Sequence, residues 1–286
     1  MSLEIFWQGV LNGLATGGIY ILVALGLTLI FGIMNIVQFA HGEIYMLGAY
    51  FTYYFSTLFG FNFWIALVFS MIIVAALGLL LERFFFRSFR NQFEPSIIVA
   101  VGLMILLQTV ALVTFGAETK SMSSIVPGIF KIFGAVLSWD RLMAIIIGLF
   151  LVVALFLMIA KTKIGQAMVA VSQDSYAASL YGVNVNRTSA VALSLGSALA
   201  AIAGSLMGVV FSVYPTMGGF ALTKGIAVVI LGGLGSIPGA VIGGLILGQI
   251  DGLVSMVSNS TISTVVGFVL IIILLLFRPR GIMGRE

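Results

Sequence analysis

The sequence contains no cysteine and a single histidine, His41. The first absence excludes disulfide bonds and thiolate metal sites, and one histidine disfavours a histidine-based metal centre. Charge is also scarce, because only 8% of the residues are charged, compared with about 25% in soluble domains. With 61% hydrophobic residues and a mean hydropathy of +1.24, the sequence predicts an integral membrane protein.

Several sequence motifs of enzymes are missing as well. No GxxxxGK[ST] loop occurs, so the chain is not expected to bind ATP in that manner or to drive transport by its own hydrolysis. An HExxH motif and a plausible Ser, His and Asp arrangement are also absent. The 13 Lys and Arg residues lie scattered among hydrophobic spans, which disfavours nucleic-acid binding. We therefore expect a protein that is not an enzyme and that binds no cofactor or metal.

Apolar runs near 20 residues, without alternating ten-residue segments, favour a helical bundle over a β-barrel. We predict an all-α polytopic membrane protein with a single transmembrane domain over 1–286. We expect about eight membrane segments, or up to about ten if broken helices are counted as two. The first, Phe6–Phe31, contains polar residues and glycines and is predicted to lie inside the bundle. Clear spans follow at Phe61–Leu81, Ser96–Phe115, Leu142–Ala160 and Thr188–Val213.

Two stretches interrupt the apolar pattern. The first contains the letters AHGE at residues 40–43, and the second reads GGLGSIPGAVIGG, where Pro238 and the glycines cannot continue a helix comfortably. We predict that Leu222–Asp251 forms two short crossings broken at this point. Such breaks line transport pathways in many membrane proteins, and their small residues serve close helix packing equally well. Their roughly mirrored positions hint at an inverted repeat.

The positive charges predict the topology. Lys and Arg are enriched in cytoplasmic loops of membrane proteins, and they gather in the loop Glu82–Pro95, in the stretch Lys161–Arg187 and in the C-terminal tail. We expect these three segments in the cytoplasm. The remaining Lys and Arg are expected outside, and they are Lys120, Lys131, Arg141 and Lys224.

Acidic residues near membrane depth are few. His41 and Glu43 could form a proton relay, because ionisable groups in a membrane are costly and usually functional. We favour the alternative that both lie at the hydrated cytoplasmic interface. Asp251 is expected at a solvated helix end on the outer side.

The stretch Lys161–Arg187 is a long polar interruption. Its apolar residues recur at three- and four-residue steps, which predicts one helix that ends at Gly182. At about 1.5 Å per residue this helix is long enough to lie along the membrane surface. From its residues alone, it is either a plain surface connector or a contact for a partner.

Three stretches together resemble one known family. They are FGIMNIVQFAHGEIYMLGAY, KTKIGQAMVAVSQDSYAASLYGVNVNR, and ILGGLGSIPGAVIGGLILG with the ending LLFRPRGIMGRE. They are similar to the LivH-type permease subunits of branched-chain amino acid ABC importers. The resemblance implies a multi-pass protein of the bacterial inner membrane with a cytoplasmic C-terminus.

The same resemblance implies partners. They are a second permease subunit, either LivM-like or a second copy, two ABC ATPase subunits that bind ATP and Mg²⁺, and a periplasmic substrate-binding protein. It also implies that the stretch Lys161–Arg187 is the cytoplasmic coupling segment that docks onto an ATPase. The residues that fit the family pattern are Gly165, Ala167, Ala170, Asp174, Ala178, Leu180 and Gly182. Gln166 and Val169 stand where the family often has Arg, so apolar contact is expected to matter more there.

The substrate class implied is branched-chain or other neutral amino acids, with urea or short amides as an alternative. An autonomous ion-coupled transporter is a second reading, but its only candidate carboxylates are Glu43 and Asp251. For the substrate path we expect a cavity of small, uncharged groups. The candidate path residues are Asn12, Thr16, Asn35, Gln38, Gly235 and Ser236.

Overall fold

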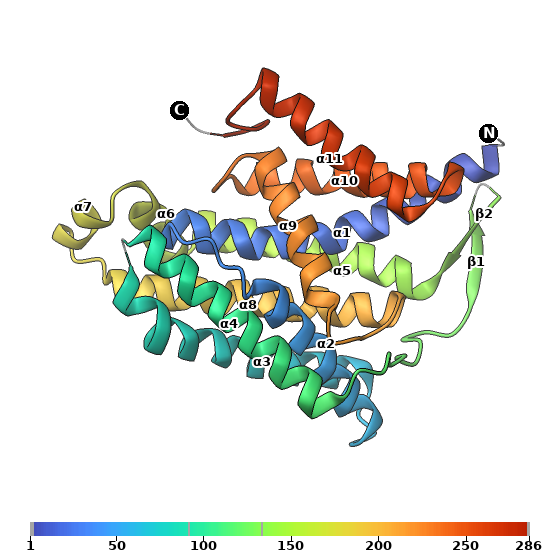
Figure 1. The fold of residues 1–286 in the computed structure, drawn as a ribbon, viewed down its shortest axis with the longest axis horizontal. Coiled ribbons are helices and arrows are strands. Elements are labelled where there is room, and N and C mark those ends of the chain that lie inside the picture. Colours follow the sequence, from blue (N-terminus) through green and yellow to red (C-terminus); the bar gives the residue numbers. More distant parts are fainter. Residues whose placement is uncertain (1–2, 91, 133, 285–286) are drawn as a thin grey trace.

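The computed structural model describes residues 3–90, 92–132 and 134–284, which form a helical bundle (Figure 1). The helices are α1 (Leu3–Met34), α2 (His41–Thr57), α3 (Phe63–Leu81) with the short turns η1 (Glu82–Phe86) and η2 (Arg87–Phe89), α4 (Phe93–Phe115), α5 (Trp139–Lys161), α6 (Lys163–Gln173), α7 (Ser175–Leu180), α8 (Val185–Val210), α9 (Met217–Gly232), α10 (Ile237–Val257) and α11 (Ser260–Phe277). Seven described helices are long and apolar enough to cross a membrane. The prediction of a polytopic helical membrane protein is confirmed.

Helix α1 is the centre of the bundle. Its residues 19–30 are buried without interruption, which confirms the predicted interior helix. Glycines on both helices let α10 pack closely against α1. A Cβ on Gly13 of α1 would lie 2.8 Å from the carbonyl oxygen of Gly248 in α10. Small residues allow such backbone approach in membrane bundles. The glycines of α10 thus serve close packing.

The break at AHGE is confirmed, but its depth differs from the expectation. Residues 35–40 are irregular, Asn35 adopts a φ of 54°, and the connection leads back toward the middle of the bundle before α2 begins (Figure 1). His41 therefore packs beside Gly26 of α1. Its side chain is 0% exposed and that of Glu43 is 1% exposed. The expected hydrated interface is wrong for both residues.

The break between α9 and α10 is also confirmed. It comprises residues 233–236, with φ values of 106° at Gly233 and 76° at Gly235. Ser236 caps α10 by accepting a hydrogen bond from the Gly239 amide at 3.2 Å. Helix α9 is steeply inclined to α1 and α10 (Figure 1). Lys224, which the charge count placed on the outer side, is therefore buried inside the bundle with 2% exposure.

The segments rich in Lys and Arg share one end of the molecule, here called the arginine end (Figure 1). Arg90 donates a hydrogen bond to Asn186 at 2.7 Å, which joins the loop after α3 to the start of α8. The C-terminal tail returns to the α9–α10 break, where the Ile282 amide donates to the Leu231 carbonyl at 2.9 Å. Arg285, expected in the cytoplasm, lies outside the described residues.

The opposite end carries a β-hairpin and is called the hairpin end. Strands β1 (Ile129–Ile132) and β2 (Ala135–Ser138) are antiparallel, with Ile129 opposite Ser138. Gln8 of α1 exchanges two hydrogen bonds with the backbone of Val136, at 2.8 and 2.9 Å. The all-α expectation missed this hairpin because four-residue strands leave little periodicity and this one depends on a contact with α1.

Candidate functional site

A cavity of about 800 Å³ lies in the hairpin-end half of the bundle. Its wall comes from α1, the ends of α8 and α10, the loop between α8 and α9, the starts of α5, α9 and α11, and one residue of α2. The polar lining residues are Asn12, Thr16, Tyr20, Tyr45, Arg141, Ser212, Tyr214, Asp251, Ser255, Ser260, Thr261, Ser263 and Thr264. A cavity of this size accommodates a small solute.

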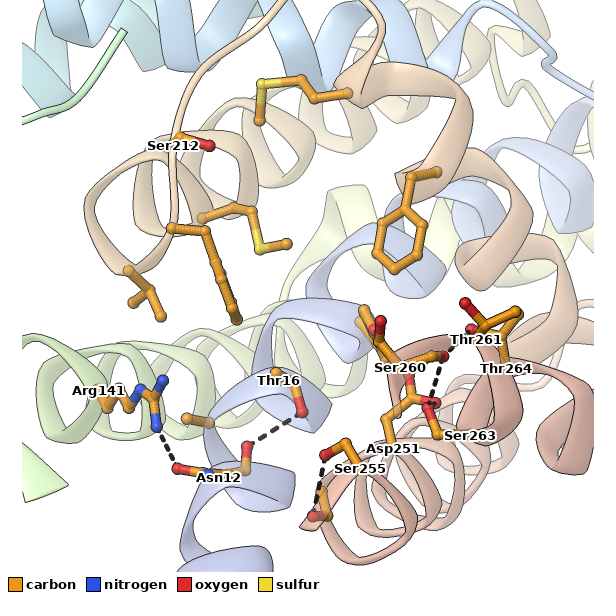
Figure 2. A pocket seen from close by; sticks show the side chains of 18 of the residues that line it. Asn12, Thr16, Arg141, Ser212, Asp251, Ser255, Ser260, Thr261, Ser263 and Thr264 are labelled. Carbon is orange, nitrogen blue, oxygen red and sulfur yellow. Dashed lines mark hydrogen bonds between the residues drawn. The ribbon is translucent and has the colours of Figure 1, made fainter. Parts of the chain in front are cut away.

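One wall of the cavity is held by Arg141, in the first turn of α5. Its guanidinium donates a hydrogen bond to the side-chain oxygen of Asn12 on α1 (Figure 2). Thr16 lies one turn further along α1, and its hydroxyl donates to the Asn12 carbonyl at 3.0 Å. A cation therefore lines a cavity for which uncharged groups were expected.

The other wall contains an ion pair that joins α9 and α10. Lys224 Nζ lies 2.9 Å from Oδ1 and 2.7 Å from Oδ2 of Asp251. The Asp251 carboxylate also accepts hydrogen bonds from the hydroxyls of Tyr20 at 2.8 Å and Ser263 at 2.9 Å. The Asp251 side chain is only 12% exposed. The expected solvated helix end is wrong, because the inclination of α9 brings Lys224 to this carboxylate.

The structure brings only some of the predicted path residues together. Asn12 and Thr16 line the cavity. Asn35 is exposed at the end of α1, and Gln38 is buried with no hydrogen-bond partner for either side-chain atom among the described residues. Gly235 and Ser236 lie in the α9–α10 break, near Gly32 at the arginine end. These four residues are not among those that line the cavity.

The stretch Lys161–Arg187 forms two helices instead of the predicted one. Thr162 caps α6 by accepting a hydrogen bond from the Gly165 amide at 3.1 Å. At Asp174 the backbone becomes extended, and its carboxylate caps α7 by accepting from the amides of Tyr176 and Ala177 at 2.8 and 2.9 Å. The predicted stop is confirmed, since Gly182 follows α7 with a φ of 83°.

The residues that the resemblance assigned to coupling differ in exposure. Gly165 and Ala178 are buried, Ala167 and Ala170 are half-buried, and Asp174, Leu180 and Gly182 are exposed. The buried pair therefore fixes the segment onto the bundle. Within the stretch Lys161–Arg187, the large exposed apolar side chains are Ile164, Val169, Tyr176, Leu180 and Tyr181. Tyr181 is 91% exposed.

Sequence reasoning missed the cluster around Asp251. One signal pointed to it, because two opposite charges stand in segments that are otherwise apolar, and intramembrane charges usually pair. The charge count treated Lys224 only as an outer charge and did not relate it to Asp251. As to metals, no group of three or more His, Asp or Glu side chains in the described ranges lies close enough to hold an ion.

These features define a class: a multi-pass helical membrane protein with broken helices and an internal cavity lined by both polar and apolar side chains, as in transport proteins. Residues 9–275 match the family described as branched-chain amino acid transport system / permease component. The chain belongs to this family.

Two relatives match along almost the whole chain. The high-affinity branched-chain amino acid transport system permease protein BraD of Pseudomonas aeruginosa is 34% identical over 98% of this chain and 96% of its own length. The corresponding permease protein LivH of Escherichia coli K12 is 35% identical, with the same coverage. Both are named as permeases of transport systems.

A solved structure shares the fold. PsaBC from Streptococcus pneumoniae in complex with Fab matches 92% of this chain and 89% of its own chain, with a TM-score of 0.50 and 14% sequence identity. At this identity the match supports the fold alone.

Proposed function

We propose that the protein is a permease subunit of an ABC importer that moves branched-chain or other neutral amino acids across the bacterial inner membrane. The observation that carries the proposal is the α6–α7 segment. It projects at the arginine end (Figure 1) and exposes apolar side chains, among them Tyr176 at 73% and Leu180 at 71%. Exposed apolar side chains grouped on a polar segment suit a protein partner.

The partners follow from the chemistry that this chain lacks. Without a phosphate-binding loop of its own, it needs separate ATPase subunits, which would bind ATP and Mg²⁺. Those subunits would dock onto α6 and α7, with Ala167, Ala170, Asp174, Leu180 and Gly182 near the contact. A second permease subunit and a substrate-binding protein would complete the importer.

The proposed orientation places the arginine end, with the C-terminus, in the cytoplasm. The positive-inside rule supports it, because Lys and Arg gather at that end. The cavity then lies in the outer half of the bundle, where a binding protein delivers substrate. Asn12 and Thr16 would line the first part of the path.

Replacing Leu180 with Asp tests the docking surface. A carboxylate at the centre of an apolar contact costs several kcal/mol to desolvate, so Leu180→Asp should abolish co-purification of the ATPase subunits. Leu58→Asp is a matched control, since Leu58 has the same 71% exposure but follows α2, away from α6 and α7. The measurement is the amount of ATPase retained on the tagged permease.

The expected result is loss of the ATPase with Leu180→Asp and retention with Leu58→Asp, at equal permease yield. Full ATPase retention with both variants, together with normal leucine uptake in reconstituted vesicles, would contradict docking on α7. Loss with both variants would show a general effect of an added charge.

A further inference from the structure

We propose that Asp251 receives the α-ammonium group of the transported amino acid, with Lys224 as the cation that keeps the empty site neutral. The inference rests on the proposed function and names a site within it. Asp251 borders the cavity, and its carboxylate is reached by α1, α9 and α11 through Tyr20, Lys224 and Ser263. Three helices thus converge on one carboxylate of α10.

Stability alone does not account for this ion pair. Burying two opposite charges costs several kcal/mol per ion, and a well-packed apolar pair of similar size is often as stable or more so. Ionisable residues within a membrane accordingly mark substrate or ion pathways. Asp251 also borders a cavity whose wall holds a second charged residue, Arg141.

The two members of the pair differ in their access to the cavity. Asp251 lines it, whereas Lys224 is not among the lining residues and its side chain is 3% exposed. Lys224 Nζ lies 5.7 Å from the ring centroids of both Tyr20 and Phe220, and these rings stabilise the ammonium behind the wall. Of the two members of this pair, a ligand in the cavity therefore contacts Asp251 first. A carboxylate at this position favours a cationic group of the ligand.

The carboxylate can accept that group by exchanging one hydrogen bond. In the structure each oxygen of Asp251 accepts two donors, which fills the roughly four lone-pair sites of a carboxylate. Ser263 has a second acceptor, because its hydroxyl also lies 3.1 Å from the Ser260 carbonyl. When this hydroxyl turns to Ser260, one site on Asp251 becomes free for an ammonium group.

The surroundings suit the rest of a neutral amino acid. The hydroxyls of Ser260 and Thr261 lie near Asp251 on the same side (Figure 2), and hydroxyl donors suit a carboxylate. Apolar lining comes from Met207, Val210, Met217 and Phe220. The Lys224–Asp251 pair is neutral, so the ammonium group of a zwitterion replaces a hydrogen bond there without leaving a net charge, and Arg141 in the wall of the same cavity is a cation for its carboxylate.

Thiol protection tests the proposal on the complete transporter. Ser255 lines the cavity one helical turn after Asp251, and the chain has no cysteine of its own. In a Ser255→Cys variant, leucine should slow modification by a small uncharged thiol reagent about threefold at twice its Kd, the factor 1 + [L]/Kd. At the same concentration, 4-methylpentanoate, which lacks only the ammonium group, should slow the reaction less than leucine does.

A second variant removes the charges. Lys224→Gln with Asp251→Asn, added to Ser255→Cys, keeps polar groups of similar size and leaves neither charge unpaired. We expect the thiol to react but leucine to give no protection. Ser123→Cys is the positional control, because Ser123 is exposed in the loop before β1 and leucine should not change its rate.

Equal protection by leucine and 4-methylpentanoate would overturn the proposal, and this comparison needs no charge substitution. Protection that persists in the uncharged variant would also overturn it, as would slowing at Ser123→Cys of the same size, which would indicate a general conformational change. Failure of the proposed function looks different, because the unmodified chain would then neither retain an ATPase nor support leucine uptake.

Discussion

At the scale of single residues, glycine decides how closely the buried helices approach. Gly48 of α2 faces Ala201 of α8, and Gly204 of α8 faces the backbone of Tyr45 in α2. The same crossing holds a hydrogen bond of 2.7 Å between the hydroxyls of Thr52 and Ser205. The buried start of α2 thus depends on positions without a side chain.

We predict that Gly204→Ala destabilises the permease. A Cβ there would collide with the Tyr45 carbonyl oxygen, and overpacking of this kind costs about 1–3 kcal/mol. Gly102→Ala is the control, also within a helix, where a Cβ would meet no described atom within 4 Å. Its thermal midpoint in detergent should stay level or rise, because Ala favours a helix by about 0.5–1 kcal/mol over Gly. A Gly204→Ala midpoint equal to the unmodified one would refute this tight contact.

Single residues also show how far sequence reasoning reaches. The two breaks were predictable, because Gly233, Gly235 and Pro238 are local signals that disfavour a continuous helix. The Lys224–Asp251 pair was missed, because Lys224 was counted only as an outer charge and the inclination of α9, which buries it beside Asp251, has no local signal in the sequence. Hydropathy records whether a helix is apolar and contains no information on its inclination.

At the scale of elements, the α6–α7 segment was likewise predicted only in part from the sequence. The apolar spacing predicted helix and Gly182 predicted its end, both correctly. The kink at Asp174 was missed because the apolar three- and four-residue spacing was treated as continuous across it, although Asp favours a helix cap over a helix interior. Its capping role becomes visible only in the backbone, which is extended there with a φ of −155°.

We predict that Asp174→Ala weakens coupling through the loss of this cap. The amides of Tyr176 and Ala177 would lose their acceptor, which costs about 1 kcal/mol of helix stability. Asp174→Asn retains a side-chain oxygen at the same place and should couple normally. The measurement is substrate-stimulated ATP hydrolysis in the reconstituted transporter. Equal loss with Ala and Asn would instead assign the effect to the charge of Asp174.

At the scale of the whole molecule, the two ends have different chemistry. The arginine end carries the loop after α3, the α6–α7 segment and the tail, whereas the hairpin end carries β1, β2 and the N-terminus (Figure 1). The cavity lies in the half that belongs to the hairpin end. The charge count correctly predicted which loops share an end of the molecule. It did not predict that Lys224 is buried within α9.

The proposed orientation predicts which surface positions react from which side of the membrane. Single cysteines are introduced at Arg87 and Lys163 of the arginine end and at Ser123 and Ser258 of the hairpin end. An impermeant thiol reagent added to intact spheroplasts should label Ser123→Cys and Ser258→Cys, and it should label the other two only after permeabilisation. Native cysteine gives no background, because the chain has none.

Ser258 is the most informative of these positions. It follows α10 and precedes α11, so its side depends on the break at residues 233–236 returning the chain to the hairpin end. Without that return, α9 and α10 would act as one crossing, and both Ser258 and the cavity wall at Asp251 would face the other way. Labelling of Ser258→Cys only from the cytoplasm, with Ser123→Cys labelled from outside, would therefore contradict the hairpin and the outward-facing cavity together. Labelling of both from outside would place the Asp251 site where a binding protein can deliver an amino acid.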